Sequence, residues 1–240
     1  MKIFNWNSIR LVLLLGAMIF VYAFSMERNL GRKLTKTEVV FLGDENLFVT
    51  SESVNKMLIE KNRQPQNLQK EKLELNKLEK SIYNHKIIVY SEVFVSVDGV
   101  LKVVVKQKTP VARLFTEDST FYFDYQGNKM PISDNYSARV PLVTGEIKAT
   151  KKQDLVELFQ IIQKDDFLKK NIIGVRIMPN GSAIMATRNY DYQIDFGRLM
   201  NIEQKLKNYK AFYQKAVSDG SIKKYKVINL IYSQQVVCTK

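Results

Sequence analysis

Few residues of this chain have side chains suited to catalysis. The sequence contains one histidine, His85, which stands among polar residues, and one cysteine, Cys238, close to the last position. A thiol nucleophile needs a base and an orienting group held around it, and a single Cys forms neither an intramolecular disulfide nor a Cys-based metal site. We therefore interpret His85 as a surface or capping residue and Cys238 as an incidental thiol, and we expect no metal or cofactor site.

Paired carboxylates and clustered aromatic residues are the other candidates for chemistry. Asp165 and Asp166 would suit acid–base catalysis, but adjacent side chains at a helix end point apart, and lysines flank them. We therefore interpret both as solvated surface residues. Aromatic residues recur between Phe115 and Tyr125 in the alternating pattern of a strand that is half core and half surface. The sequence also lacks the usual phosphate-binding, nucleophile-elbow and zinc motifs. These observations predict a protein that is not an enzyme.

The overall charge indicates what kind of neighbour the protein has. Lys and Arg number 37 and Asp and Glu 24 among 240 residues, which gives a net charge of +13. Such a charge favours an anionic neighbour, namely nucleic acid, an acidic membrane surface or a polyanionic cell wall. Apolar residues make up 45% of the chain, as in proteins that bury a core, so disorder is excluded as its main state.

The uncharged segment from Leu11 to Met26 predicts a transmembrane helix over residues 11–26. At about 1.5 Å per residue it spans about 24 Å, slightly less than the ~30 Å hydrocarbon core. This prediction divides the N-terminal region into a cytoplasmic tail (1–10), the helix and a linker (27–36). A cleavable signal peptide, with Ala23-Phe24-Ser25 as its cleavage site, is the alternative.

The charges around this segment leave its orientation open. Two basic residues precede it and four follow it up to residue 36, which by the positive-inside rule favours a cytoplasmic body. The short N-terminal tail and the large C-terminal region favour the opposite orientation, because large domains translocate largely regardless of their charge.

Residues 37–108 predict an α+β module with the order strand, helix, helix, strand, strand. A short apolar run at 39–42 is followed by a helix capped by Thr50 and by a second amphipathic helix. Valines alternate with polar residues on both sides of Asp98-Gly99, which predicts a hairpin with a two-residue loop. Two helices suffice to cover one face of the resulting sheet.

Residues 109–240 predict a β-rich domain with two helices. The spacing of apolar residues places these helices at about 152–164 and 199–217. Short strands are expected around them, and the last is an alternating segment from Tyr225 to Val237. The predicted fold class is therefore α+β, with a single N-terminal transmembrane helix, a β-α-α-β-β module and a β-rich domain.

The order of these parts resembles the bacterial cell-division protein family FtsQ (DivIB), whose body contains a POTRA domain followed by a β-rich domain. Short segments in the family's order over residues 37–232 carry the resemblance. They are the opening strand and helix start Val39–Gly43 and Thr50–Val54, the hairpin strands Ile88–Val97 and Leu101–Val105, the junction Lys106–Ala112, the turn Phe123–Gly127, the segment Val140–Gly145 and the motif Val227–Leu230. Gln107 and Asn229 stand where the family has an acid, and neither position is catalytic in it.

The resemblance implies a non-catalytic, bitopic scaffold in the cytoplasmic (inner) membrane at the division septum, with its body outside the cytoplasm. Proteins of this family bind the FtsB–FtsL pair and help to recruit and regulate the septal peptidoglycan synthase FtsW–FtsI. Neither nucleic acid nor a small-molecule substrate is expected as a partner. The family's last strand receives a strand of the partner, and the resemblance thereby assigns Tyr232, Val236 and Val237 to partner binding.

One hypothesis from another class competes with this scaffold. An extracytoplasmic wall-binding protein or wall-modifying enzyme would use the aromatic segment 115–125 together with a carboxylate such as Asp118 or Asp124. Incubation of the body with peptidoglycan separates the two, because turnover or tight binding of the sacculus favours the enzyme or wall-binding protein.

The apolar segment gives a prediction on topology. We expect an uncleaved signal anchor, with the chain from Glu27 onward outside the cytoplasmic membrane. A reporter that is active only outside the cytoplasm, fused after Lys240, should be active and should fractionate with membranes. A soluble product that begins near Met26 would show cleavage instead, and an inactive reporter would show the reverse orientation.

Overall fold

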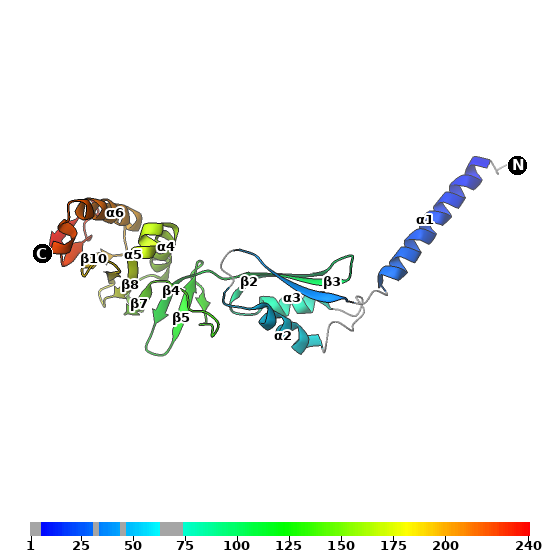
Figure 1. Ribbon diagram of the computed structural model, residues 1–240, viewed down its shortest axis with the longest axis horizontal. Coiled ribbons are helices and arrows are strands. Elements are labelled where there is room, and N and C mark those ends of the chain that lie inside the picture. The colour runs from blue at the N-terminus through cyan, green and yellow to red at the C-terminus, as the bar shows by residue number, and fades with distance from the viewer. Residues whose placement is uncertain (1–5, 31–33, 44–46, 63–73) are drawn as a thin grey trace. The chain divides into compact units, whose positions relative to one another are not determined.

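The computed structural model describes residues 6–30, 34–43, 47–62 and 74–240. Contacts within the chain divide it into two units, Met1–Gln107 and Lys108–Lys240 (Figure 1). Parts of the predicted tail (1–10) and of the predicted linker (27–36) lie outside the described residues.

A single apolar helix, α1 (Trp6–Leu30), precedes the first sheet. Its segment Ser8–Arg28 has a mean hydropathy of 2.1, and none of it is buried. The 25 residues of α1 extend over about 37 Å, enough to cross a ~30 Å hydrocarbon core. The helix is longer than the uncharged segment 11–26 because polar residues at both ends continue the same helical backbone. These properties are consistent with a single-pass membrane anchor.

The first unit contains a three-stranded sheet with two helices packed on one face. Its elements are β1 (Lys36–Phe41), α2 (Ser51–Asn62), α3 (Leu75–Tyr83), β2 (Ile88–Val95) and β3 (Val100–Gln107). The central strand β3 pairs in parallel with β1 and antiparallel with β2. The core between helices and sheet consists of Val54, Leu58, Leu78, Ile82, Leu101, Val103 and Val105. The element order is the one that the sequence predicts, whereas the identification of the unit as a POTRA domain stays a prediction.

The hairpin between β2 and β3 has a longer loop than the sequence predicts. Gly99 N–H donates to Ser96 C=O, and Ser96 N–H donates to Val100 C=O. The loop is therefore Val97-Asp98-Gly99, and the two-residue loop is wrong, because the Ser96 side chain also accepts a hydrogen bond from Val100 N–H and widens the turn. Gly99 has a φ of 80°, which glycine adopts at little cost.

At the end of β3, the buried side chain of Gln107 holds the loop that leads into α2. Its Oε1 accepts hydrogen bonds from the N–H groups of Phe48 (3.0 Å) and Val49 (3.2 Å), and its Nε2 donates to Val49 C=O (2.9 Å). At neutral pH a glutamate in this position would not make the same bonds, because an ionised carboxylate has no donor to offer the carbonyl. The same loop ends at Thr50, whose Oγ1 accepts from Ser53 N–H (3.2 Å), so the predicted cap of α2 is confirmed.

The second unit contains a nine-stranded sheet with the order β12-β11-β10-β9-β8-β7-β4-β5-β6. The strands are β4 (Pro110–Phe115), β5 (Thr120–Asp124), β6 (Lys129–Met130), β7 (Leu142–Gly145), β8 (Ile172–Ile177), β9 (Ser182–Thr187), β10 (Gln193–Arg198), β11 (Val227–Asn229) and β12 (Val237–Thr239). Strand β7 pairs in parallel with both β4 and β8 and so joins the two halves of the sheet.

Three α-helices, α4 (Lys152–Lys164), α5 (Asp166–Asn171) and α6 (Ile202–Ser218), cover one face of this sheet (Figure 1). Their apolar side chains form one core with the sheet, to which Leu158, Phe159, Leu206 and Tyr209 contribute. The mixed α+β class is confirmed. The sequence predicts only two helices in this domain, because the six residues of α5 are too few for a helical period to be recognised.

Asp165 is the residue that begins α5. Its Oδ1 accepts hydrogen bonds from the N–H groups of Phe167 (2.9 Å) and Leu168 (3.0 Å), and its Oδ2 lies 2.5 Å from Lys210 Nζ on α6. Partial burial raises the pKa of Asp165, but the bond and charge of Lys210 and the two N–H donors outweigh burial and lower it. The interpretation of Asp165 as a solvated residue is therefore wrong, because it is an N-cap that also links α5 to α6.

The alternating segment Tyr225–Val237 does not form one strand. Its first part contains β11, residues 231–234 form a bend, and β12 begins only at Val237. The prediction of a continuous strand is wrong because Asn229 Oδ1 accepts a hydrogen bond from Ile231 N–H (2.9 Å) and turns the backbone. Such a side-chain-to-backbone turn does not alter the alternation of apolar residues, so that alternation does not predict where the strand is interrupted.

The hydrogen bonds of Gln107 give a prediction on stability. Gln107→Glu should lower the free energy of unfolding at neutral pH by about 1–3 kcal/mol, because a carboxylate leaves Val49 C=O without its donor. The loss should shrink as pH falls towards 4, since a protonated carboxyl group donates to that carbonyl. Urea unfolding of both proteins at each pH measures the effect, and Gln153→Glu, on an exposed turn of α4, controls for the added charge. Equal stability of Gln107→Glu and the parent at neutral pH would contradict the assignment.

Candidate functional site at the edge of the large sheet

The strand β12 lies at one end of the nine-stranded sheet. Within the described part of the chain it pairs with β11 alone. Thr239 C=O accepts a hydrogen bond from Lys226 N–H (2.8 Å), so the backbone of Thr239 faces β11. Because the backbone groups of successive strand residues point to opposite sides, the N–H and C=O of Cys238 face away from the sheet. An edge of this kind can accept a strand from another chain.

The three residues that the resemblance assigns to partner binding occupy different parts of this edge. Val237 begins β12 and is 43% exposed, and Tyr232 lies in the bend and is 56% exposed. Val236 immediately precedes β12 and packs, half-buried, against the core. The structure thus places only Val237 within the edge strand, and the involvement of all three in binding stays a prediction.

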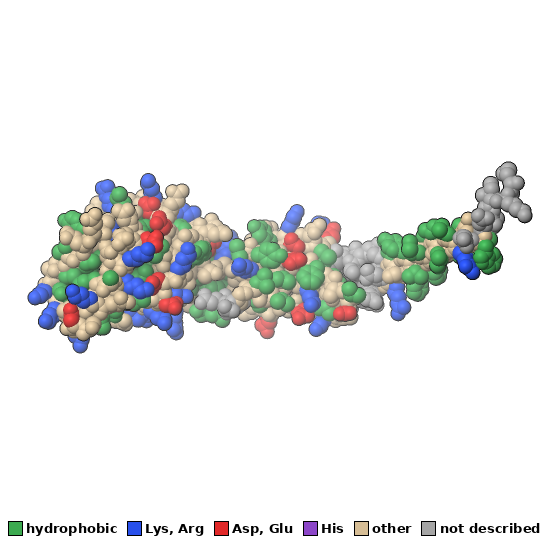
Figure 2. All heavy atoms as spheres, turned by 90° about the horizontal axis from the view of Figure 1, so that it is seen from above, with side chains coloured by type: hydrophobic (Ala, Val, Ile, Leu, Met, Phe, Trp, Pro, Cys, Tyr) green, Lys and Arg blue, Asp and Glu red, His purple; other side chains and the backbone are tan. Residues whose placement is uncertain are grey.

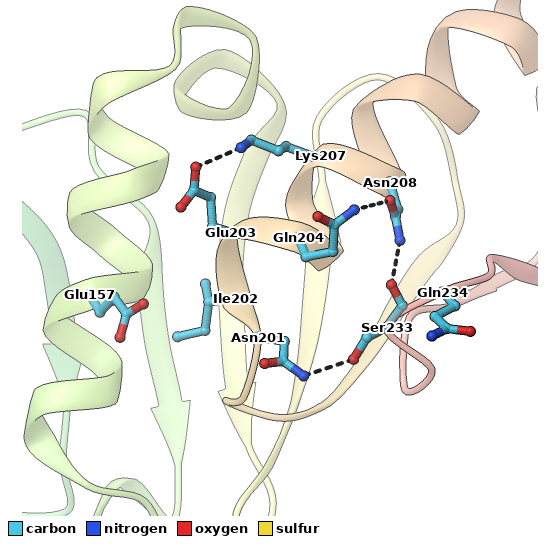
Figure 3. Close-up of a pocket in the computed structure, with 9 residues that line it drawn as sticks. All are labelled: Glu157, Asn201, Ile202, Glu203, Gln204, Lys207, Asn208, Ser233 and Gln234. Carbon is cyan, nitrogen blue, oxygen red and sulfur yellow. Dashed lines mark hydrogen bonds and ion pairs between the residues drawn. The ribbon is translucent and has the colours of Figure 1, made fainter.

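The bend between β11 and β12 is held by side chains of α6 and of the residue before it (Figure 3). Asn208 Nδ2 donates to Ser233 C=O (2.8 Å), and Asn201 Nδ2 donates to Ser233 Oγ (3.0 Å). Gln204 Nε2 in turn donates to Asn208 Oδ1 (2.8 Å), which orients the Asn208 amide. The position of the bend, and of Tyr232 within it, therefore depends on α6.

A hollow of about 650 Å³ adjoins the bend. Polar side chains dominate its lining, which consists of Glu157, Asn201, Ile202, Glu203, Gln204, Lys207, Asn208, Ser233 and Gln234 (Figure 3). Glu203 and Lys207 form an ion pair of 2.7 Å and also line a second hollow of about 400 Å³, which contains Ile161 and Leu206. Small-molecule sites are mostly apolar with a few convergent polar groups. The polar lining of the hollow at the bend is therefore more typical of a surface that contacts another protein than of a small-molecule site.

A buried lysine of α6 stabilises a β-bulge in β10, the strand next to β11. The pairing of β9 and β10 shifts between Asp195 and Gly197. Lys205 Nζ donates to the C=O of Phe196 (2.9 Å), which lies within this shift, and to the C=O of Arg198 (3.1 Å), which follows it. Burial lowers the pKa of Lys205, and nearby Asp195 partly opposes that effect. Lys205 is not among the residues predicted from the sequence, although it falls among the apolar positions of α6, where a charged residue indicates a buried role.

The aromatic segment 115–125 does not assemble an exposed stacking surface. Tyr122 is fully buried, and its hydroxyl accepts a hydrogen bond from Ala138 N–H (3.2 Å). Asp124 is buried and accepts two backbone hydrogen bonds in the turn after β5. Asp118 lies in an exposed turn before β5. Tyr122 therefore serves the packing of the core, and Asp124 serves the formation of a turn.

His85 contacts the backbone of its own loop, and Cys238 packs beside the core. His85 Nδ1 accepts a hydrogen bond from Ile87 N–H (3.4 Å), and burial lowers the pKa of His85. Cys238 is half-buried beside the core, and burial raises the pKa of its thiol. Among the residues that the structure describes, no three His, Cys, Asp or Glu side chains converge as metal ligands would.

The contacts of the bend give a prediction on local stability. Asn208→Ala should accelerate amide hydrogen exchange in residues 231–236 by about fivefold or more, because a lost hydrogen bond is worth about 1 kcal/mol. Hydrogen–deuterium exchange with mass spectrometry measures it. Gln160→Ala on α4, which removes a side-chain hydrogen bond to Tyr125 C=O, serves as the matched control and should leave residues 231–236 unchanged. Unchanged exchange in Asn208→Ala would mean that α6 does not hold the bend.

Comparison with known proteins places the second unit in a family. A model of the family described as FtsQ/DivIB, C-terminal related, matches residues 109–239, more than half of the chain. A search of curated proteins found no match. The matched residues include all nine strands of the large sheet, with the edge strand β12 and the three covering helices. The chain therefore belongs to the FtsQ/DivIB-related family of bacterial cell-division proteins.

Proposed function

We propose that this cell-division protein is a non-catalytic, bitopic scaffold of the divisome that binds an FtsB–FtsL pair through the edge of its large sheet. Through that pair it helps to recruit and regulate the septal peptidoglycan synthase FtsW–FtsI. The observation that carries the proposal is the outward-facing backbone of Cys238 in β12. Main-chain hydrogen bonds to such an edge supply affinity, and the side chains beside it supply specificity.

The side chains around β12 support this proposal. Tyr232 and Val237 are large apolar residues that remain exposed next to the edge. A tyrosine ring buries apolar area on binding while its hydroxyl stays in contact with water. Each lies beside a well-packed part of the fold, since Leu230 and Ile228 of the same segment are fully buried. A rigid edge of this kind loses little conformational entropy when a partner strand is added.

The N-terminal part of the chain gives this scaffold its place in the cell. We propose that α1 crosses the cytoplasmic membrane once and that both units lie outside the cytoplasm, at the division septum. The first unit, with its β-α-α-β-β order, is then a POTRA domain that begins a few residues after the membrane-spanning helix α1. In this location the net charge of +13 meets anionic lipid and wall polymers rather than nucleic acid.

The contribution of the bend is tested with Tyr232→Ala. The full chain in detergent, carrying an affinity tag, is used to capture a co-expressed FtsB–FtsL pair, and Tyr232→Ala should weaken binding by about fivefold or more, as truncation of an exposed aromatic contact does. Tyr83→Ala, at the end of α3, is the matched control, because Tyr83 is 58% exposed against 56% for Tyr232. Equal capture by both variants would remove Tyr232 from the site.

The edge itself is tested in the same assay with Cys238→Pro and Cys238→Val. Proline removes the outward N–H donor of residue 238, whereas valine keeps it and keeps an apolar side chain. Capture should therefore fall with proline and persist with valine, while circular dichroism shows that both variants stay folded. Full capture by a folded Cys238→Pro would rule out strand addition at β12.

A further inference from the structure

Positive charge gathers at one end of the edge strand β12. Lysine and arginine side chains outnumber acidic ones on the visible surface of the second unit (Figure 2). In its C-terminal segment four exposed lysines flank the β11–β12 pair: Lys223 and Lys224 in the 3-10 helix η4 (Ser221–Lys224), Lys226 before β11 and Lys240 after β12. None of them forms an ion pair within the described part of the chain, where ion pairs involve other lysines.

The register of the two strands brings these lysines together. Val227 pairs with Thr239, so Lys226 and Lys240 lie at the same end of the antiparallel pair, next to the end of η4. Asp219 is an acidic group nearby; its pKa is lowered by hydrogen bonds with Ser221 and further by Lys215 and Lys224. Asp191, two residues before β10, is also exposed and lies near the start of β11, because Gln193 pairs with Val227.

The opposite end of β12 has no comparable excess of positive charge. The bend that leads into it contains the neutral residues Ser233 and Gln234, and the hollow beside it is lined by the Glu203–Lys207 ion pair and by Glu157. The outward backbone groups of Cys238 therefore lie between a positive end and an end without excess positive charge. Exposed charges act over about 8–10 Å at moderate ionic strength. The electrostatic potential along an added strand is therefore most positive beside Lys226 and Lys240 and falls towards the bend.

We propose that the edge of β12 selects a partner strand that carries carboxylate side chains at the end lying beside Lys226 and Lys240. This inference rests on the proposed strand addition and names the chemistry of the strand that fits it. Opposite charges at matching positions raise the association rate and fix the register of the strand. The same lysines oppose parallel pairing of β12 with a second copy of this chain, because that arrangement brings the two positive ends together.

The test uses the full chain in non-ionic detergent and fluorescently labelled peptides with a common Val-Thr-Val-Thr-Val centre. One peptide carries two glutamates at its amino end, another carries them at its carboxyl end, and a third carries two lysines at its amino end. Fluorescence anisotropy should show that one of the acidic peptides binds about tenfold more tightly than the lysine peptide at low salt. High salt should narrow this difference, because it screens exposed charges.

Two single charge reversals make the assignment specific. Lys226→Glu should abolish the preference for glutamate, whereas Lys148→Glu, an equal change at an exposed residue of the distant 3-10 helix η3 (Ile147–Ala149), should preserve it. Equal binding of all three peptides, with capture of the FtsB–FtsL pair intact, would overturn this inference and leave the proposed function standing. Loss of both would overturn both. If Lys226→Glu instead reduced binding to vesicles containing anionic lipid, without any peptide preference, the lysines would serve a membrane surface and the inference would be wrong.

Discussion

Every backbone N–H and C=O of an open β-sheet needs a partner, and the outermost strands leave half of theirs outside the sheet. In the second unit this constraint falls on β6 and β12, at the two ends of the sheet. The Thr239 carbonyl of β12 faces β11, and the Cys238 backbone therefore faces outward. The chain makes β12 the outermost strand by turning back after Asn229. Without that turn, β11 would itself end the sheet. The feature on which the proposed function depends is thus a consequence of one local turn near the C-terminus.

Helix α6 connects the elements that set the shape of this edge. Tyr209 is fully buried, and its hydroxyl hydrogen-bonds with Tyr192 (2.7 Å) and with Asn171 at the end of α5. One turn earlier, Lys205 holds the bulge of β10, and Asn208 on the exposed side holds the bend. Because one rigid helix fixes all these contacts, the edge strand and the bend keep a constant relation to the core. Constant geometry of this kind suits the proposed role in binding a partner, because a rigid surface loses little conformational entropy on association.

The charged side chains that could act as acids or bases make hydrogen bonds that stabilise the fold. Asp165 caps α5 and pairs with Lys210, Asp124 shapes a turn, and Lys205 bonds two carbonyl groups. Gln107 shows the same principle in the first unit, where a neutral amide supplies the one donor that an acid lacks. The resembled family has an acid at this position. In this chain Gln107 takes its place, and its amide donates to the Val49 carbonyl, which an ionised acid would not do.

Much of this protein follows from local properties of its sequence. The uncharged N-terminal run, the helical spacing of apolar residues in α4 and α6, and the cap at Thr50 are set by neighbouring residues, and the sequence determines them by itself. Short elements held by side-chain-to-backbone bonds are different: α5 depends on Asp165, and the break before β12 depends on Asn229. Apolar periodicity does not report such bonds. The order of the nine strands, the outward direction of the Cys238 backbone and the grouping of Lys226 with Lys240 arise from pairing between distant segments. Only the tertiary structure decided them, because strand pairing is a long-range choice that no local pattern encodes.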